Sequence, residues 1–148
     1  MHARYIMSMA KPTSFRLPED LLDLLDDEAN SSNTSVTALV TSLLGEGLRT
    51  RRFPGIVYRD GPTGRRAGLA GGPDVWEVVR SLKATPGKPE QRVRGLAEQL
   101  GLAVERIRLA VDFYSANPDE VERSIAADEH AAAQMREMIS RREQLLSS

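Results

Sequence analysis

The sequence predicts a mainly α-helical protein, in which a short N-terminal strand precedes two helices and a small helical domain precedes a C-terminal helix. Apolar stripes at helical spacing recur along the chain, a stretch before residue 20 alternates with period two, and glycine and proline clusters separate the stripes. With 148 residues, the chain can hold one ordinary domain or two very small ones. The predicted parts are a leader (1–10), an N-terminal domain (11–52), a linker (53–73), a small helical domain (74–117) and a C-terminal helix (118–148).

The composition excludes several classes of site. Cysteine is absent, and His2 and His130 stand far apart, so we expect neither disulfides nor a metal site. No apolar run approaches the roughly 20 residues of a membrane span, and residues 1–10 lack the apolar core of a secretory signal. We therefore expect a cytoplasmic protein. Only three Phe, three Tyr and one Trp are present, and such aliphatic small cores often need a partner, which favours a dimer.

The net charge of −1 averages over segments of opposite sign. Six acids and no base occupy Glu19–Glu28, whereas Arg49–Arg66 holds six arginines and one acid. Residues 80–108 carry seven bases against three acids, and the chain from Asp119 carries seven acids against four bases. A nearly neutral chain can therefore still present basic faces to phosphate, although solvated faces without a partner are the alternative.

The segment Lys11–Pro18 is predicted to be a short strand that ends at proline. Period-two alternation places Thr13, Phe15 and Leu17 on one face. A lone strand cannot satisfy its own backbone groups, and no second convincing strand lies nearby in the sequence. The predicted pairing partner is therefore the same segment of a second copy.

Two amphipathic helices follow. Pro18 suits a first helical position, Glu19 and Asp20 suit the positive end of a helix dipole, and Thr34 or Ser35 can cap the second helix. Leucines at helical spacing give each helix one apolar face that a single copy would leave unburied. The residues expected at the dimer interface are Thr13, Phe15, Leu17, Leu21, Leu25, Val36, Leu39, Val40 and Leu43.

Residues 11–50 resemble the CopG/Arc/MetJ ribbon–helix–helix family. The likeness lies in Phe15-Arg16-Leu17-Pro18-Glu19 and Thr34-Ser35-Val36-Thr37-Ala38-Leu39-Val40. The resemblance implies a dimer in which two strands pair antiparallel and enter the major groove of DNA.

The residues expected to contact DNA lie at two places in this domain. Arg16 can bind a guanine edge with two hydrogen bonds and Ser14 is a permissive base contact, while Lys11 would lie on phosphate. Exposed amides near Thr34 and Ser35 can also bind phosphate. The alternative is a dimer that binds no DNA, and the acidic first helix would have to face away from the phosphates.

The middle of the chain is predicted to be a linker and a small helical domain. Phe53–Gly61 indicates a turn and a short strand, and Gly64–Pro73 a glycine- and arginine-rich loop without the spacing of a nucleotide-binding motif. Asp74 can begin a helix that runs through Leu82. Residues 93–111 indicate helix, glycine turn, helix, as packing or as a second DNA reader.

Residues 56–125 resemble a small helical domain often found in VapB-type antitoxins beside PIN-like nucleases. The likeness lies in Asp60-Gly61-Pro62, Gly64-Arg65-Arg66, Asp74-Val75-Trp76-Glu77-Val78, Phe113-Tyr114 and Asn117-Pro118-Asp119-Glu120. The resemblance implies that the partner is a PIN-like ribonuclease toxin, whose active site gathers acidic residues around Mg²⁺.

Pro118 begins a final helix that can extend to about Leu146. Its apolar stripe is thin, which favours a helix that orders against something else. Methionines adapt to irregular grooves and arginines can pair with carboxylates, so we expect this helix to bind the toxin. Packing on residues 75–114, or pairing with its twin, is the alternative. The expected toxin-binding residues are Ile125, Met135, Arg136, Met138, Ile139, Arg141 and Arg142.

No set of residues for nucleophilic or acid–base catalysis can be assembled from the sequence, so we expect neither an enzyme nor a cofactor. The predicted function is that of an antitoxin, which binds operator DNA as a homodimer, represses its own operon and neutralises the toxin. A free-standing regulator without a toxin, or a scaffold that binds no nucleic acid, are the alternatives.

Overall fold

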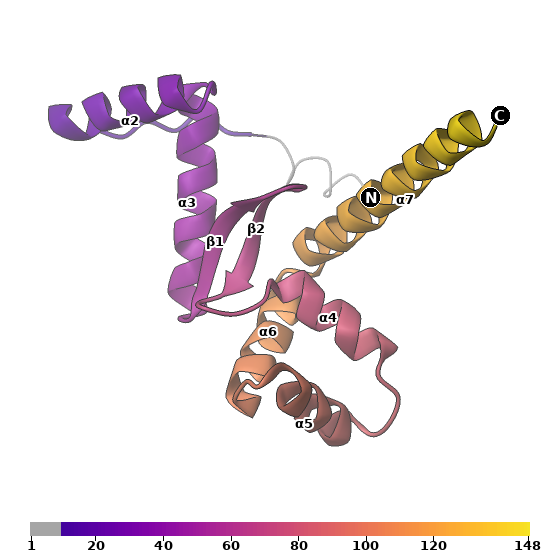
Figure 1. Cartoon of the computed structure of the whole chain (residues 1–148). Helices are drawn as coiled ribbons and strands as arrows, with labels where there is room; N and C mark the ends of the chain where they lie inside the picture. The colour runs from indigo at the N-terminus through magenta and orange to yellow at the C-terminus, as the bar shows by residue number, and fades with distance from the viewer. Residues whose placement is uncertain (1–9) are drawn as a thin grey trace, which may run out of the picture. The chain divides into compact units, whose positions relative to one another are not determined.

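The computed structural model describes residues 10–148, which form six helices and one two-stranded antiparallel sheet (Figure 1). The chain divides into two compact units, one ending at Gly45 and the other comprising Glu46–Ser148. The predicted N-terminal domain ended at residue 52. In the structure, Glu46–Arg52 belong to the second unit, so the division falls within helix α3 (Val36–Arg52).

The predicted N-terminal ribbon–helix–helix fold is wrong. Residues 10–18 form neither strand nor helix, and the sheet is built from residues that follow the first two helices. A strand persists only where a neighbouring strand completes its hydrogen bonds, and none of residues 10–148 pairs with Lys11–Pro18 in this way. Phe15 and Leu17, expected to face an interface between strands, lie exposed in this irregular segment instead.

Helix α2 spans Glu19–Ser31, so Pro18, predicted to be the first helical residue, is the N-cap that precedes it. Asn33 has a φ of 50°, and its turn leads into α3, Val36–Arg52. Of the two predicted caps, Ser35 is the one whose hydroxyl accepts a hydrogen bond, from the Ala38 backbone N–H at 3.1 Å.

Strands β1 (Ile56–Gly61) and β2 (Gly64–Leu69) form a hairpin in which Ile56 lies opposite Leu69. The predicted loop over Gly64–Pro73 is therefore a strand in its first half. Two glycines and two arginines conceal its alternation, but the strand lies close enough in sequence to pair with β1. Gly64, with a φ of +113°, provides the tight turn that few other residues would tolerate.

Four helices complete the second unit. They are α4 (Val75–Ala84), α5 (Pro89–Leu100), α6 (Val104–Ala116) and α7 (Pro118–Ser147). The predicted glycine turn is confirmed, because Gly101 has a φ of 65° between α5 and α6. The hairpin, α4, α5 and α6 each contribute fully buried side chains to one core, and α7 adds Val121 and Ile125.

Replacing Phe113 with alanine tests this core. Phe113 is fully buried and meets the ring of Phe53 edge-on at 5.4 Å between centroids. We expect Phe113→Ala to lower the free energy of unfolding by about 3–5 kcal/mol, because it leaves a cavity, as measured by urea denaturation. Phe15→Ala is the matched control and should change it by less than about 0.5 kcal/mol, since Phe15 is exposed. Equal effects of the two substitutions would contradict this assignment of the core.

Candidate interaction surfaces

A buried carboxylate joins the hairpin to the helices of the second unit. Asp74 immediately precedes α4 and has only 6% of its side chain exposed. Arg59 of β1 donates to its Oδ1 at 2.8 Å, and Arg66 of β2 pairs with its Oδ2. The Trp76 indole N–H also donates to Oδ2, at 3.1 Å. Two strands and one helix therefore meet at a single side chain.

The end of α3 is fixed to the same unit by two polar contacts. Arg65 of β2 binds both carboxylate oxygens of Glu46, at 2.6 and 2.9 Å. Arg49 donates to the Tyr58 hydroxyl at 2.6 Å, and that hydroxyl donates to Glu120 of α7 at 2.7 Å. Burial, followed by the hydrogen bond to Glu120, raises the pKa of Tyr58 well above its usual value, so the hydroxyl remains protonated and able to donate.

The N-terminal unit has almost no core of its own. Within residues 10–45, the buried apolar residues are Leu25 and Ala29. Leu39 and Val40 are half-buried. The large apolar side chains exposed on α2 and on α3 up to Gly45 are Leu21, Leu22, Leu24, Val36, Leu43 and Leu44, and Leu48 is exposed on the part of α3 that belongs to the second unit. Two helices with so little buried apolar area gain little free energy from packing to set against the entropy cost of ordering them.

The residues predicted to bind DNA are all exposed. Lys11, Ser14 and Arg16 lie in the irregular segment before α2, and Thr34 and Ser35 lie at the start of α3. The Ser35 hydroxyl is engaged by the Ala38 N–H. All five residues therefore lie in the N-terminal unit, and, contrary to the prediction, Ser14 and Arg16 do not lie on a paired strand.

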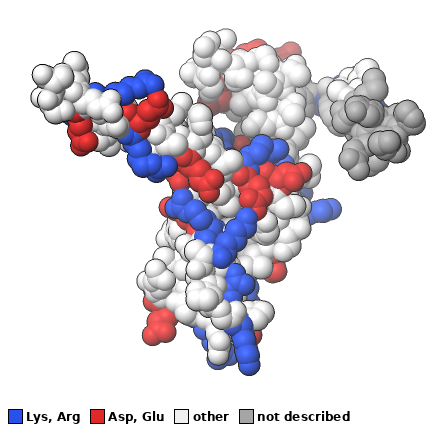
Figure 2. Space-filling model, turned by 90° about the vertical axis from the view of Figure 1, so that its right-hand side faces the viewer, with Lys and Arg blue, Asp and Glu red and all other residues white. Residues whose placement is uncertain are grey.

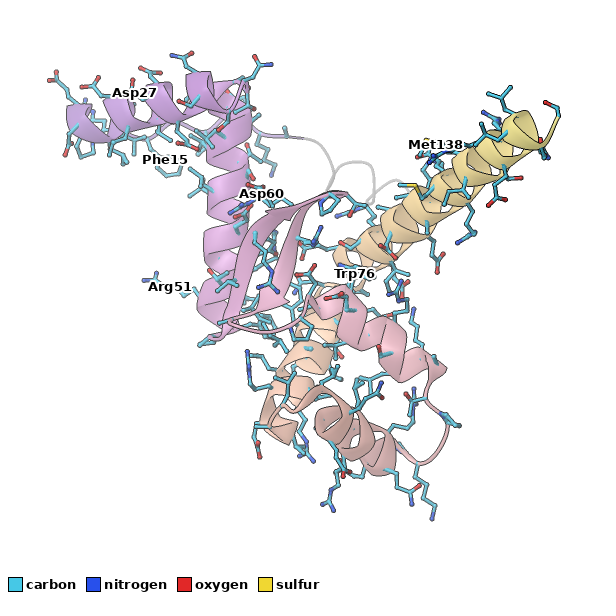
Figure 3. All side chains as sticks on the ribbon, in the orientation of Figure 1. Phe15, Asp27, Arg51, Asp60, Trp76 and Met138 are labelled. Atoms are coloured by element: carbon cyan, nitrogen blue, oxygen red, sulfur yellow. The ribbon has the colours of Figure 1, made fainter. Side chains whose placement is uncertain are left out.

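Helix α7 is buried on one side near its N-terminal end and exposed toward its C-terminal end. Its first turns pack on the core through Val121 and Ile125, the latter only 7% exposed, so Ile125 lies apart from the rest of the predicted toxin-binding set. Beyond them the helix extends past the other helices of its unit, and Figure 3 shows Met138 on this part. We call residues 131–148 the α7 tail.

The α7 tail carries an apolar stripe with no cover from its own unit. Met135, Met138 and Ile139, three of the residues predicted to bind the toxin, are about half exposed. Leu145 and Leu146, each 75% exposed, continue the stripe, although the predicted set ended at Arg142. Their spacing of seven from Met138 and Ile139 is the signal that would have included them. The predicted arginines Arg136, Arg141 and Arg142 are exposed alongside, and Arg141 pairs with Glu137.

Polar contacts hold the base of α7 against α4. Arg80 pairs with Asp128 at 2.6 Å and stacks over the Trp76 ring at 4.6 Å. Lys83 pairs with Glu122, and that ammonium, followed by the Tyr114 hydroxyl, holds the pKa of Glu122 below its usual value. These pairs are exposed and orient the helix more than they stabilise it.

Residues 10–148 contain neither a cluster suited to a metal ion nor a helix suited to crossing a membrane. No group of three or more His, Asp or Glu side chains lies close enough together there to hold a metal ion. None of the helices in that range combines the length and apolar character needed to cross a membrane.

Comparison with known proteins gives no relative. No protein-family model matches the chain, and neither the curated proteins nor the solved structures include a significant match.

Replacing Asp74 with asparagine tests the junction between hairpin and helices. The change leaves two arginines beside a neutral side chain, so we expect the free energy of unfolding to fall by about 3–5 kcal/mol. Asp60→Asn is the control, because the Asp60 side chain is 87% exposed and its loss should cost less than about 0.5 kcal/mol. Urea denaturation followed by circular dichroism measures both. A loss below about 1 kcal/mol for Asp74→Asn would show that the ion pairs do not hold the hairpin.

Proposed function

We propose that this chain is the antitoxin of a type II toxin–antitoxin pair. It binds operator DNA as a homodimer, represses its own operon and neutralises a PIN-like ribonuclease toxin. The observation that carries the proposal is the distribution of exposed apolar side chains. They gather on α2 and α3 and again on the α7 tail, whereas the residues between these segments have a closed core.

The homodimer is the first step of the proposal. The exposed leucines of α2 and α3 form a larger apolar surface than isolated surface residues normally do, and such surfaces mark protein–protein contacts. A twin copy offers the same helices, and two-fold dimers are the commonest soluble oligomers. The six acids of Glu19–Glu28 would then remain at the solvated rim.

DNA binding is the second step. Lys11, Ser14 and Arg16 precede α2 in a segment without regular structure, so their side chains are open to phosphates and base edges. The first turn of α3, after Thr34 and Ser35, adds backbone amides at the positive end of a helix dipole. Dimerisation would double this set of contacts and so raise the affinity for a symmetric operator.

Toxin neutralisation is the third step. An amphipathic helix can lie in an apolar groove of its partner, with anchors at spacings of three and four such as Met135, Met138 and Ile139. Arg136 and Arg142 flank these anchors and are suited to pair with the acidic active site of a magnesium-dependent nuclease. Such pairing would compete with the metal ion for the same carboxylates.

Two matched substitutions separate the steps. Leu43→Asp places a charge on the face of α3, so we expect a monomer by analytical ultracentrifugation and loss of salt-dependent binding to the upstream DNA of its gene. Met138→Asp is the control, because Met138 is similarly exposed but lies on the α7 tail, and it should leave dimer and DNA binding intact. A monomeric unmodified chain at micromolar concentration would contradict the dimer, and a dimer without DNA affinity would instead indicate a scaffold.

The α7 tail is tested by removing it. Truncation after His130 removes the tail and keeps Asp128, which pairs with Arg80, so it should leave operator binding unchanged and release the toxicity of the co-expressed neighbouring nuclease in a growth assay. Met138→Asp should weaken neutralisation in the same direction, whereas Leu43→Asp should affect it less. If the truncated chain protects cells fully, the neutralising surface lies elsewhere in the protein. If no nuclease is bound by the intact chain, the chain is a regulator without a toxin.

A further inference from the structure

A second, smaller surface lies on the helical part of the second unit. Helices α4, α5 and α6 enclose a groove of about 260 Å³, which we call the α4–α6 groove. Its walls are mostly apolar, with Val79 and Leu82 from α4, Val93 from α5 and Val111 from α6. The proposed function does not involve this groove, because that function depends on residues 11–48 and on the α7 tail.

Arg92 of α5 lines the groove with an incompletely satisfied guanidinium. One of its Nη atoms donates to the Leu82 carbonyl oxygen. Its Nε is the one buried side-chain nitrogen or oxygen among residues 10–148 without a hydrogen-bond partner. Leaving such a donor unpaired is costly, and buried polar groups are nearly always satisfied.

No carboxylate within residues 10–148 forms an ion pair with Arg92, in contrast to two arginines of the hairpin. Arg59 and Arg66 both pair with Asp74. The second cation of the groove, Lys83, pairs with Glu122. Arg92 is therefore the cation of the groove with unused hydrogen-bonding capacity. It lies among apolar side chains, where it would attract an anion more strongly than it would in water.

The size of the groove limits what it can hold. Sites for drug-sized ligands and cofactors usually enclose about 300–1,000 Å³, so this groove suits one or two side chains rather than a nucleotide. Basic side chains also gather on the lower part of the face in Figure 2, over the region of α4 to α6. Apolar walls beside a cation match an aliphatic side chain next to a carboxylate.

We propose that the α4–α6 groove binds an acidic, aliphatic peptide segment of a partner protein. The aliphatic side chain would pack between Val79, Val93 and Val111, and the adjacent carboxylate would pair with the Arg92 guanidinium. Because Nε is closed to solvent in the empty groove, the guanidinium turns toward the peptide and exchanges the Leu82 carbonyl for the carboxylate. This exchange gives Nε the acceptor that it lacks.

Two peptides that differ only in charge test the proposal on the intact chain. The probes are acetyl-Leu-Glu-Leu-amide and its uncharged counterpart acetyl-Leu-Gln-Leu-amide, titrated into isotopically labelled protein and followed by NMR. We expect shifts at the methyl groups of Val79, Val93 and Val111, and binding of the acidic peptide at least about tenfold tighter. Equal affinities, or shifts that avoid these methyl groups, would overturn the proposal without any substitution.

Substitutions on α5 assign the preference to one residue. Arg92→Met keeps the length of the side chain and should abolish the preference for the acidic peptide while leaving the methyl shifts in place. Arg94→Met, two residues along the same helix and exposed, should keep the full preference. A preference that survives Arg92→Met, or disappears in Arg94→Met, would show that Arg92 is not the carboxylate-binding residue.

Discussion

The buried carboxylate of Asp74 is the contact on which the second unit depends. It accepts hydrogen bonds from Arg59 and Arg66, one on each strand of the hairpin, and so fixes the hairpin against the start of α4. Gly68 belongs to the same arrangement, because a Cβ there would overlap the Arg59 guanidinium. With the hairpin in place, Ile56 and Leu69 can close one side of the core formed with α4 and α6.

Burial is distributed very unequally along the chain. The second unit encloses a contiguous apolar cluster, while α2 and the first part of α3 keep most of their leucines in solvent. Polar contacts hold the end of α3 within the second unit. Arg49 donates to Tyr58, and Arg65 pairs with Glu46. The described residues thus form one closed core, in the second unit, and leave large apolar side chains exposed on α2, α3 and the α7 tail.

The sequence allowed most helices to be predicted, because apolar stripes, Pro18, Gly101 and Pro118 mark where they begin and end. The prediction was wrong for residues 11–18, where alternation over five residues resembles a strand but no segment within residues 10–148 pairs with it. Strand β2 was missed because glycines replace the side chains that would reveal its period. The α7 stripe could be predicted from residue spacing alone. The missing hydrogen-bond partner of the Arg92 Nε depends on how three helices converge, and the sequence carries no signal for it.

The anchoring of α7 also affects the thermodynamics of its far end. Starting a helix is the unfavourable step in forming one, whereas each further residue adds to an existing turn at little cost. The turns that pack on the core through Val121 and Ile125 are already helical. The later turns therefore only extend an existing helix. A surface that captures the far end would therefore pay less conformational entropy than one that must fold a disordered peptide. A larger part of the free energy of each apolar contact would then contribute to the binding affinity.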